Sequence, residues 1–270
     1  MPFFLIAAAA TIAGTPANIE QVIRRAPAGA TIELAPGDYG KISIKGKAWA
    51  KPITLNLKPG AQATLEVIDS KGVRVSGGTF GLIDKGYAIH VRNSQNVGFA
   101  NLLIKNAQRG IVIAESQDVT VSRADMVNLT IDGINIASSQ RVSVTDSICR
   151  EFNTGKAHPD CIQLWSSPKG GVTQDVTLLR NRSDGNMQGF TAFNHVRNGI
   201  DDGGFDRITM ADNWVRGDYP NGVAVYDCRN CRIENNKAVT PKKAKYNVQV
   251  RVIRCSDCTV AGNENGKREK

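Results

Sequence analysis

The sequence predicts an all-β solenoid, a parallel β-helix in which each repeat makes one coil. The repeat is clearest at Gly110–Val121, where two pairs of apolar residues alternate with polar residues, as in strands with one buried face. Val97, Val119 and Val142 hold the same place in successive units and are 22 and then 23 residues apart. A fixed period of this size is typical of solenoids, and the lack of an amphipathic helix in the unit argues against a leucine-rich repeat. The unit returns at residues 88–99, 133–144, 222–233 and 249–260.

The 270 residues are expected to form one domain, because each coil of a solenoid packs on its neighbours. Residues 1–40 would form an N-terminal strand and cap, residues 41–265 the coils, and residues 266–270 a charged tail. The net charge of +9 favours an acidic partner, such as a uronic-acid polysaccharide, a nucleic acid or a membrane surface. A nucleic acid is the least favoured of these, because basic and acidic residues are interleaved and no nucleic-acid module is recognisable. No apolar run reaches the ~18–20 residues of a membrane span.

The N-terminal region is expected to close one end of the solenoid. Phe3–Ala13 is apolar and has no basic residue before it, so it is either a poor signal peptide or a first strand. Asn18–Ala26 has helical spacing and predicts a capping helix over the open sheet end. The following AGATIELAPGDY, residues 28–39, resembles the cap and first coil of pectate-lyase-like right-handed β-helix proteins. That resemblance implies a right-handed winding and an extracellular, periplasmic or virion-associated location.

Polar residues at fixed places in the repeat predict the corners of the coils. Short alternating strands are expected at Lys41–Ile44, Ile53–Leu57 and Thr64–Ile68. An inward-facing serine ladder is expected at one corner, formed by Ser70, Ser94, Ser116 and Ser139. After Val144 the period lengthens, and the added residues should form loops on a rigid scaffold, where functional residues usually lie. These loops fall at residues 150–160, 166–174, 194–205 and 215–221.

The densest group of candidate functional residues is KAHPDCIQLW, residues 156–165. Aligned on the repeat, Gln163 points outward, Asp160 stands at the start of the strand, and His158 comes just before it. Stacking of coils would place Asp160 in one column with Asp132, Gln188 and Asn221, and Gln163 in another with His90, Val112, Asn135, Thr191 and Ala224. Because Asp and Asn also close turns, we interpret Asp132 and Asn221 as turn residues. We interpret His158, Asp160 and Gln163 as functional.

A short motif in this region resembles a known pattern. His158, Asp160, Ile162 and Gln163, followed one coil later by Gln188-Gly189-Phe190, resemble an H-x-D-x-I-Q … Q-G-[IF] pattern. The pattern occurs in bacterial and phage β-helix proteins grouped with polysaccharide lyases and C5-epimerases. The chain lacks the D-P-H-[DE] motif of alginate C5-epimerases and the G-H-G and R-x-K motifs of polygalacturonase-type hydrolases. The resemblance implies an enzyme that acts on an acidic polysaccharide.

The reaction that we expect first is β-elimination. It needs a cation that neutralises the uronate, a base that takes the C5 proton and an acid that protonates the leaving oxygen. We assign the base to His158, oriented by Asp160, and the acid to His195 or Tyr226. The neutralising cation is expected among Arg150, Lys156, Arg197 and Arg216. Substrate contacts are expected from Gln163, Gln188, Trp165, Trp214 and Tyr219.

Two acidic residues leave further alternatives open. Asp201 and Asp202 lie in a glycine-rich loop and are turn residues, hydrolytic carboxylates that act with Asp160, or oxygen ligands of a calcium ion. No other cofactor is expected. A glycoside hydrolase on the same scaffold is therefore an alternative to the lyase. A non-catalytic glycan-binding solenoid, such as a phage tail or surface component, is another.

The cysteines have the spacing of a zinc motif, Cys228-x-x-Cys231 and Cys255-x-x-Cys258. On the repeat, however, all four take inward places in two adjacent coils. We therefore expect buried free thiols that pack like small apolar residues, with zinc or disulfides as the alternatives. Cys149 and Cys161 are expected to be further thiols in or near the core.

Overall fold

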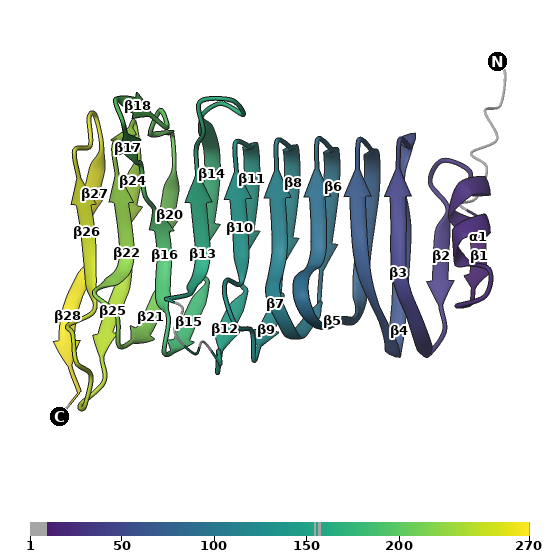
Figure 1. The fold of residues 1–270 in the computed structure, drawn as a ribbon, viewed down its shortest axis with the longest axis horizontal. Helices are drawn as coiled ribbons and strands as arrows, with labels where there is room; N and C mark the ends of the chain where they lie inside the picture. Colours follow the sequence, from purple (N-terminus) through teal and green to yellow (C-terminus); the bar gives the residue numbers. More distant parts are fainter. Residues whose placement is uncertain (1–9, 154, 156–157, 270) are drawn as a thin grey trace, which may run out of the picture.

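The protein is a parallel β-helix whose coils stack along one axis, as the repeats predict (Figure 1). The computed structural model describes residues 10–153, 155 and 158–269. Each coil adds one strand segment to each of three parallel faces, here called faces A, B and C. Among the described residues, no helix is long and apolar enough to cross a membrane.

The strands are assigned to the faces by their pairing. Four long strands turn corners and contribute to more than one face: β3 (Gly37–Lys45), β4 (Ala48–Ile68), β5 (Lys71–Arg92) and β7 (Leu103–Ala114). Face A holds their segments 41–45, 64–68, 87–92 and 109–114, then β10 (Ile134–Ala137), β13 (Asp160–Trp165), β16 (Gln188–Ala192), β22 (Asn221–Tyr226) and β26 (Gln249–Ile253). Face B holds segments 53–57 and 71–76 with β1 (Thr11–Gly14), β2 (Thr31–Leu34), β6 (Gln95–Ala100), β8 (Gln117–Ser122), β11 (Gln140–Thr145), β14 (Thr173–Leu179), β19 (Phe205–Asp206), β20 (Thr209–Ala211), β23 (Cys228–Arg229), β24 (Arg232–Glu234) and β27 (Thr259–Ala261). Face C holds segments 79–83 and 103–107 with β9 (Asp125–Val127), β12 (Ile148–Arg150), β15 (Arg182–Gly185), β21 (Trp214–Gly217), β25 (Lys237–Thr240) and β28 (Glu264–Arg268).

The core consists of aliphatic and aromatic side chains that stack from coil to coil. From segment 109–114 to β22, successive strands of face A pair without a shift, so equivalent inward residues lie directly above one another. One such fully buried stack is Ile111, Ile134, Ile162, Phe190 and Val223. Because neighbouring strands are only ~4.8 Å apart, each of these side chains packs on the same kind of residue in the next coil.

The predicted serine ladder is confirmed at the corner between faces A and B. The backbone N–H of Ser94 donates to the hydroxyl of Ser116, and the N–H of Ser116 donates to the hydroxyl of Ser139, both at 3.1 Å. The residue before each serine has a positive φ, for example 51° at Glu115 and 48° at Ser138. This conformation turns the chain sharply and leaves a buried N–H, which the hydroxyl of the next coil satisfies.

A second ladder, which the sequence analysis did not predict, lies at the corner between faces B and C. Here asparagine amides accept hydrogen bonds from the backbone of the preceding coil: Asn181 Oδ1 from Ser147 N–H at 3.0 Å and Asn213 Oδ1 from Asn181 N–H at 2.9 Å. Asn236 and Asn263 continue the ladder. The amide nitrogen of Asn213 also donates to the carbonyl of Leu178 at 2.9 Å. The side-chain amide of Asn213 therefore bonds the preceding coil twice, once through its oxygen and once through its nitrogen.

The sequence-based prediction is confirmed at the N-terminal end of the solenoid and is partly wrong at the C-terminal end. The predicted cap is confirmed: α1 (Ile19–Arg25) buries Ile19 and Ile23 at the N-terminal end of the solenoid (Figure 1). Residues 1–9, which include most of Phe3–Ala13, lie outside the described residues, and Thr11–Gly14 pairs with β2. The prediction of a charged tail at 266–270 is wrong for most of its length, because Glu264–Arg268 is a strand on β25. Its charges are tolerated since it is an edge strand, and Lys237 pairs with Glu264 at 3.0 Å.

The prediction of free cysteines is wrong. The described cysteines form three disulfides, Cys149–Cys161, Cys228–Cys231 and Cys255–Cys258. The repeat correctly buries Cys228 and Cys231, but each C-x-x-C pair spans a corner within one coil. Their Cα atoms are 6.2 and 5.9 Å apart, within the range that a disulfide bridges. The thiolates that a zinc ion would need are therefore taken up in disulfides.

Replacement of Asn213 by alanine should lower the free energy of unfolding by about 2–4 kcal/mol, since the change removes an acceptor and a donor from buried backbone groups. Denaturant unfolding followed by circular dichroism measures the change. Asn153→Ala, at an exposed position, is the matched control and should stay within about 0.5 kcal/mol of the wild type. Equal destabilisation by both substitutions would contradict a structural role for the amide ladder.

Candidate functional site

The outer surface of face A has a continuous column of polar residues where each strand begins. This first column consists of Tyr87, Arg109, Asp132, Asp160, Gln188 and Asn221. Arg109 Nε lies 3.5 Å from Asp132 Oδ2, and the backbone N–H of Asp160 donates to Asp132 Oδ1 at 3.0 Å. The predicted column from Asp132 to Asn221 is thus confirmed, and it extends toward the N-terminus through Arg109.

A second column lies further along the same strands and is also confirmed by the strand pairing. It consists of Glu66, His90, Val112, Asn135, Gln163, Thr191, Ala224 and Arg251. The amide of Asn135 donates to Asp132 Oδ2 at 3.1 Å and to Gln163 Oε1 at 3.4 Å. Arg251 Nη1 donates to Asn221 Oδ1 at 3.2 Å. The two columns therefore form one hydrogen-bonded network across several coils.

Asp160 is the most unusual ionisable group in this network, because the residue is only 1 % exposed. Burial raises the pKa of its carboxyl group well above the ordinary value of 3.8, and the negative charge of Asp132 raises it further. A hydrogen bond of 2.6 Å from the Thr191 hydroxyl opposes the rise without cancelling it. The carboxyl group thus keeps its proton to a higher pH than an exposed aspartate and is suited to donate it.

His158 lies at the edge of the first column and is exposed. Its Nδ1 is 3.4 Å from Gln188 Nε2, which in turn is 3.5 Å from Asp160 Oδ2. Gln188 therefore stands between His158 and Asp160, and the direct orientation of His158 by Asp160 that the sequence suggests is not formed. The Cys149–Cys161 disulfide joins β12 to β13 and closes the loop on which His158 lies, which restricts where the imidazole can go.

Aromatic side chains form a third column at the far end of the strands of face A. Trp165 is 49 % exposed and pairs with Ala137 in the neighbouring coil. Phe193 follows Ala192, which is opposite Leu164, so it falls beside Trp165. Its ring centroid lies 4.8 Å from that of Tyr226, at an interplanar angle of 51°. The outward places of Trp165 and Tyr226 agree with the sequence analysis, which missed Phe193 although its alternation with Thr191 was a readable signal.

Other predicted residues lie away from this network. His195 and Arg197 are exposed in the connection that carries the small antiparallel pair β17 (Val196–Arg197) and β18 (Ile200–Asp201), at the opposite edge of face A from Asp160 (Figure 1). The register places His195 seven residues beyond Gln188, which is the partner of Asp160. An approach of His195 to His158, as the sequence suggested, does not occur.

Asp201 has the contacts of a turn residue. Its Oδ1 accepts from the backbone N–H of Gly203 at 2.7 Å and from the amide of Asn194 at 2.9 Å, and these bonds lower the pKa of the Asp201 carboxyl. The backbone N–H of Asp202 donates to the carbonyl of His195. Among the described residues there is no cluster of three or more His, Cys, Asp or Glu side chains arranged to hold a metal ion. Neither aspartate lies in the columns with Asp160.

The predicted cations are also displaced from the acidic column. Arg150 pairs with Asp125 at 2.9 Å and Arg216 with Glu269 at 2.7 Å, both on face C. Trp214, on the same face, lies under the guanidinium group of Arg182 at 4.0 Å. Lys156 lies outside the described residues, and Tyr219 is half-buried just before β22. Among the described residues, Arg109 and Arg251 are cations that contact the first column, and the same repeat alignment could have found them.

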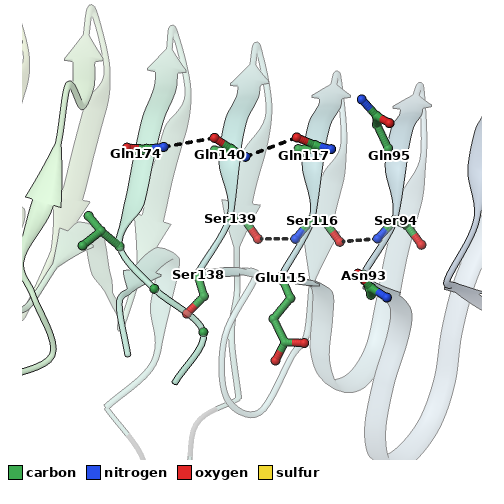
Figure 2. A pocket seen from close by; sticks show the side chains of 13 residues that line it. Asn93, Ser94, Gln95, Glu115, Ser116, Gln117, Ser138, Ser139, Gln140 and Gln174 are labelled. Carbon is green, nitrogen blue, oxygen red and sulfur yellow. Dashed lines mark hydrogen bonds between the residues drawn. The ribbon is translucent and has the colours of Figure 1, made fainter. Parts of the chain in front are cut away.

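A separate groove of about 480 Å³ lies at the corner between faces A and B (Figure 2). Its lining includes a row of glutamine amides that bond one another, Gln140 to Gln117 at 3.2 Å and Gln174 to Gln140 at 3.0 Å. Glu115 is the ionisable side chain among its described lining residues. The groove has no pair of groups for acid–base chemistry, which leaves the outer surface of face A as the candidate site.

Comparison with known proteins agrees with this architecture. A family model described as the right-handed beta helix region matches residues 87–265, and the chain belongs to this family. No curated relative matches the sequence.

Three solved structures are similar to the whole fold. They are a surface adhesin of Streptococcus pneumoniae, PfbA (16 % identity, 86 % of this chain and 71 % of that chain, TM-score 0.61), the polygalacturonase of Erwinia carotovora ssp. carotovora (11 %, 100 % and 99 %, 0.59) and an alginate lyase of a Paenibacillus species (13 %, 96 % and 99 %, 0.52). At these identities the likeness is one of fold.

The raised pKa of Asp160 predicts a pH-dependent loss of stability that Asp160→Asn should abolish. In the unfolded chain the carboxyl group titrates near 3.8, whereas in the folded protein it holds its proton to a higher pH. Stability therefore falls as pH rises through the interval between the two values. Relative to the wild type, the Asp160→Asn variant should gain stability from about pH 4 toward neutrality. Urea unfolding at a series of pH values tests this, and Asp257→Asn, at an exposed position, should follow the wild-type curve.

Proposed function

We propose that the protein is an enzyme that binds an acidic polysaccharide along the outer surface of face A and cleaves its glycosidic bonds. The observation on which the proposal chiefly rests is the buried, proton-holding carboxyl group of Asp160 in the middle of the polar columns. The aromatic column offers ring faces for sugars, and the polar columns offer hydrogen-bonding groups. The net charge of +9 and the similarity to a polygalacturonase and an alginate lyase support an anionic glycan.

Hydrolysis is the reaction that the arrangement of carboxyl groups supports best. Asp160 gives its proton to the departing glycosidic oxygen while the bond from that oxygen to the anomeric carbon breaks. Asp132 lies in the adjacent coil, about 5 Å away, which leaves no room for a water molecule between the two groups. Its carboxylate therefore attacks the same carbon and forms a covalent glycosyl–enzyme intermediate, which a water molecule deprotonated by Asp160 then hydrolyses. The partner of Asp160 is therefore Asp132, in place of Asp201 or Asp202. Because Asp160 is covered, the bound sugar must displace the side chain of Gln188 or His158 to reach it.

β-Elimination is the second candidate, favoured by the exposed imidazole of His158 at the edge of the first column and by Arg109 within that column. His158 would take the C5 proton and Asp160 would protonate the leaving oxygen. Arg109, whose side chain reaches Asp132 in the coil next to Asp160, would neutralise the uronate. Neither reaction uses a cofactor.

A location outside the cytoplasm belongs to the same proposal. Disulfides persist in oxidising compartments and at cell or virion surfaces, and three are present among the described cysteines. A similar fold occurs in a streptococcal surface adhesin. A protein that binds the glycan without cleaving it is the outcome that the following experiment would reveal if the catalytic part of the proposal is wrong.

Asp160→Asn and Asp132→Asn should each lower the rate of polysaccharide cleavage by about 10²–10⁴-fold, since each removes one of the two catalytic carboxyl groups. Incubation with polygalacturonate, alginate and hyaluronan, followed by reducing-end assay and product mass spectrometry, measures the rate and the reaction type. Hydrolysis adds water to the products, whereas elimination gives unsaturated, ultraviolet-absorbing ends. The exposed Asp212→Asn is the matched control and should retain full activity. Unchanged polymer length with the wild type on every substrate would rule out the enzyme.

A further inference from the structure

A second hollow lies on face A, nearer the N-terminus than the acidic column. It has a volume of about 210 Å³, and its lining includes Lys41, Thr64, Glu66, Ile83, Tyr87 and His90. None of these residues is part of the proposed cleavage machinery. The hollow combines an exposed aromatic ring, a histidine and a lysine, which is a combination suited to a charged sugar.

The hollow is continuous with the columns of the candidate site. Tyr87 pairs with Arg109, and His90 pairs with Val112, which pairs with Asn135. Tyr87 is thus three coils from Asp160 along the first column, by way of Arg109 and Asp132. At ~4.8 Å for each coil the separation is about 14 Å. A polysaccharide that lies along the axis over Asp160 would reach the hollow several sugar rings away.

The aromatic part of the hollow has the geometry of a sugar platform. Tyr87 is 39 % exposed, and its ring centroid lies 5.0 Å from that of His90 at an interplanar angle of 56°. Burial lowers the pKa of His90 below its ordinary value of 6.5, so the imidazole is neutral at neutral pH. A neutral imidazole has one donor and one acceptor nitrogen, and no described residue hydrogen-bonds to either. Both remain available to sugar hydroxyl groups.

The rim of the hollow has an excess of positive charge. Lys41 Nζ lies 2.5 Å from Glu66 Oε1, and Lys45 Nζ lies 3.0 Å from Glu66 Oε2. One carboxylate thus holds two ammonium groups in place and neutralises only one of them. Both lysine side chains are more than half exposed, so an incoming carboxylate can reach them. The charge favours an acidic sugar over a neutral one.

From these contacts we infer a distal subsite for a uronate residue, formed by Tyr87, His90 and the Lys41–Glu66–Lys45 cluster. It binds the same polysaccharide chain that reaches Asp160 and makes affinity depend on chain length. The inference rests on the proposed function for one assumption, that the bound polysaccharide runs along the solenoid axis over Asp160. The subsite itself requires only that an anionic glycan binds along face A.

Calorimetry with the Asp160→Asn protein tests the subsite without cleavage. The probes are tri- and nonasaccharides of galacturonate and of mannuronate, with neutral mannan oligosaccharides of the same lengths. The acidic nonasaccharide should bind about tenfold more tightly than the trisaccharide. Tyr87→Ala should remove this gain and leave trisaccharide affinity unchanged, whereas Tyr87→Phe, which keeps the ring, should preserve most of it. Lys41→Gln with Lys45→Gln should reduce the gain for acidic probes only.

The outcomes separate this inference from the proposed function. Equal affinity for short and long acidic probes, equal weakening of both by Tyr87→Ala, or no binding of any probe would overturn the subsite. An equal gain for neutral probes would overturn its preference for uronate. Length-dependent binding that is lost in Tyr87→Ala, combined with no cleavage by the wild type, would support the subsite and reject the enzyme.

Discussion

Hydrogen bonds from the backbone at two of the corners, A to B and B to C, to a side chain of the next coil are the constraint on which the rest of the structure depends. Sharp turns with positive φ leave N–H groups inside the protein, and the serine and asparagine ladders satisfy them. Such a bond forms only when neighbouring coils are in register. A slip of one residue would leave the buried N–H groups at the corner without their side-chain acceptors and would turn the inward side chains outward. Both the corner hydrogen bonds and the packing of the core therefore specify the register.

The candidate site follows from that register. Residues as far apart in sequence as Tyr87 and Arg251 lie on one face because each coil places outward side chains at the same positions along its face A strand. The site has no closed pocket. It is an extended surface with charged, amide and aromatic columns in parallel, and an extended polymer is the ligand that can contact all of them at once. The loops that lengthen the later coils lie at the edges of this surface and bring His158 to one edge and His195 to the other.

The repeats in the sequence were sufficient to predict the fold, the serine ladder and the first two columns, because each depends on position within the repeat alone. The cap was predicted from the helical spacing of Asn18–Ala26. What they missed depends on contacts that the repeat does not encode. The asparagine ladder begins at Asn181, where the longer loops disturb the period. The repeat alignment correctly predicted that Cys228 and Cys231 face inward, but their disulfide across a corner of one coil depends on local geometry. Arg150 and Arg216 were assigned to the site by their loops, although their strands belong to face C.

The same coil spacing also explains why the two central aspartates differ. Residues in register on adjacent coils are ~4.8 Å apart, and two carboxylates that close resist being ionised together. Asp132 has Arg109, the amide of Asn135 and the backbone N–H of Asp160 as partners, all of which stabilise a negative charge. Asp160 is buried beside that charge with a neutral hydroxyl, Thr191, as its donor. The proton is therefore held on Asp160 by its neighbours in the stack, so the register that stabilises the solenoid also determines which carboxyl group is the acid.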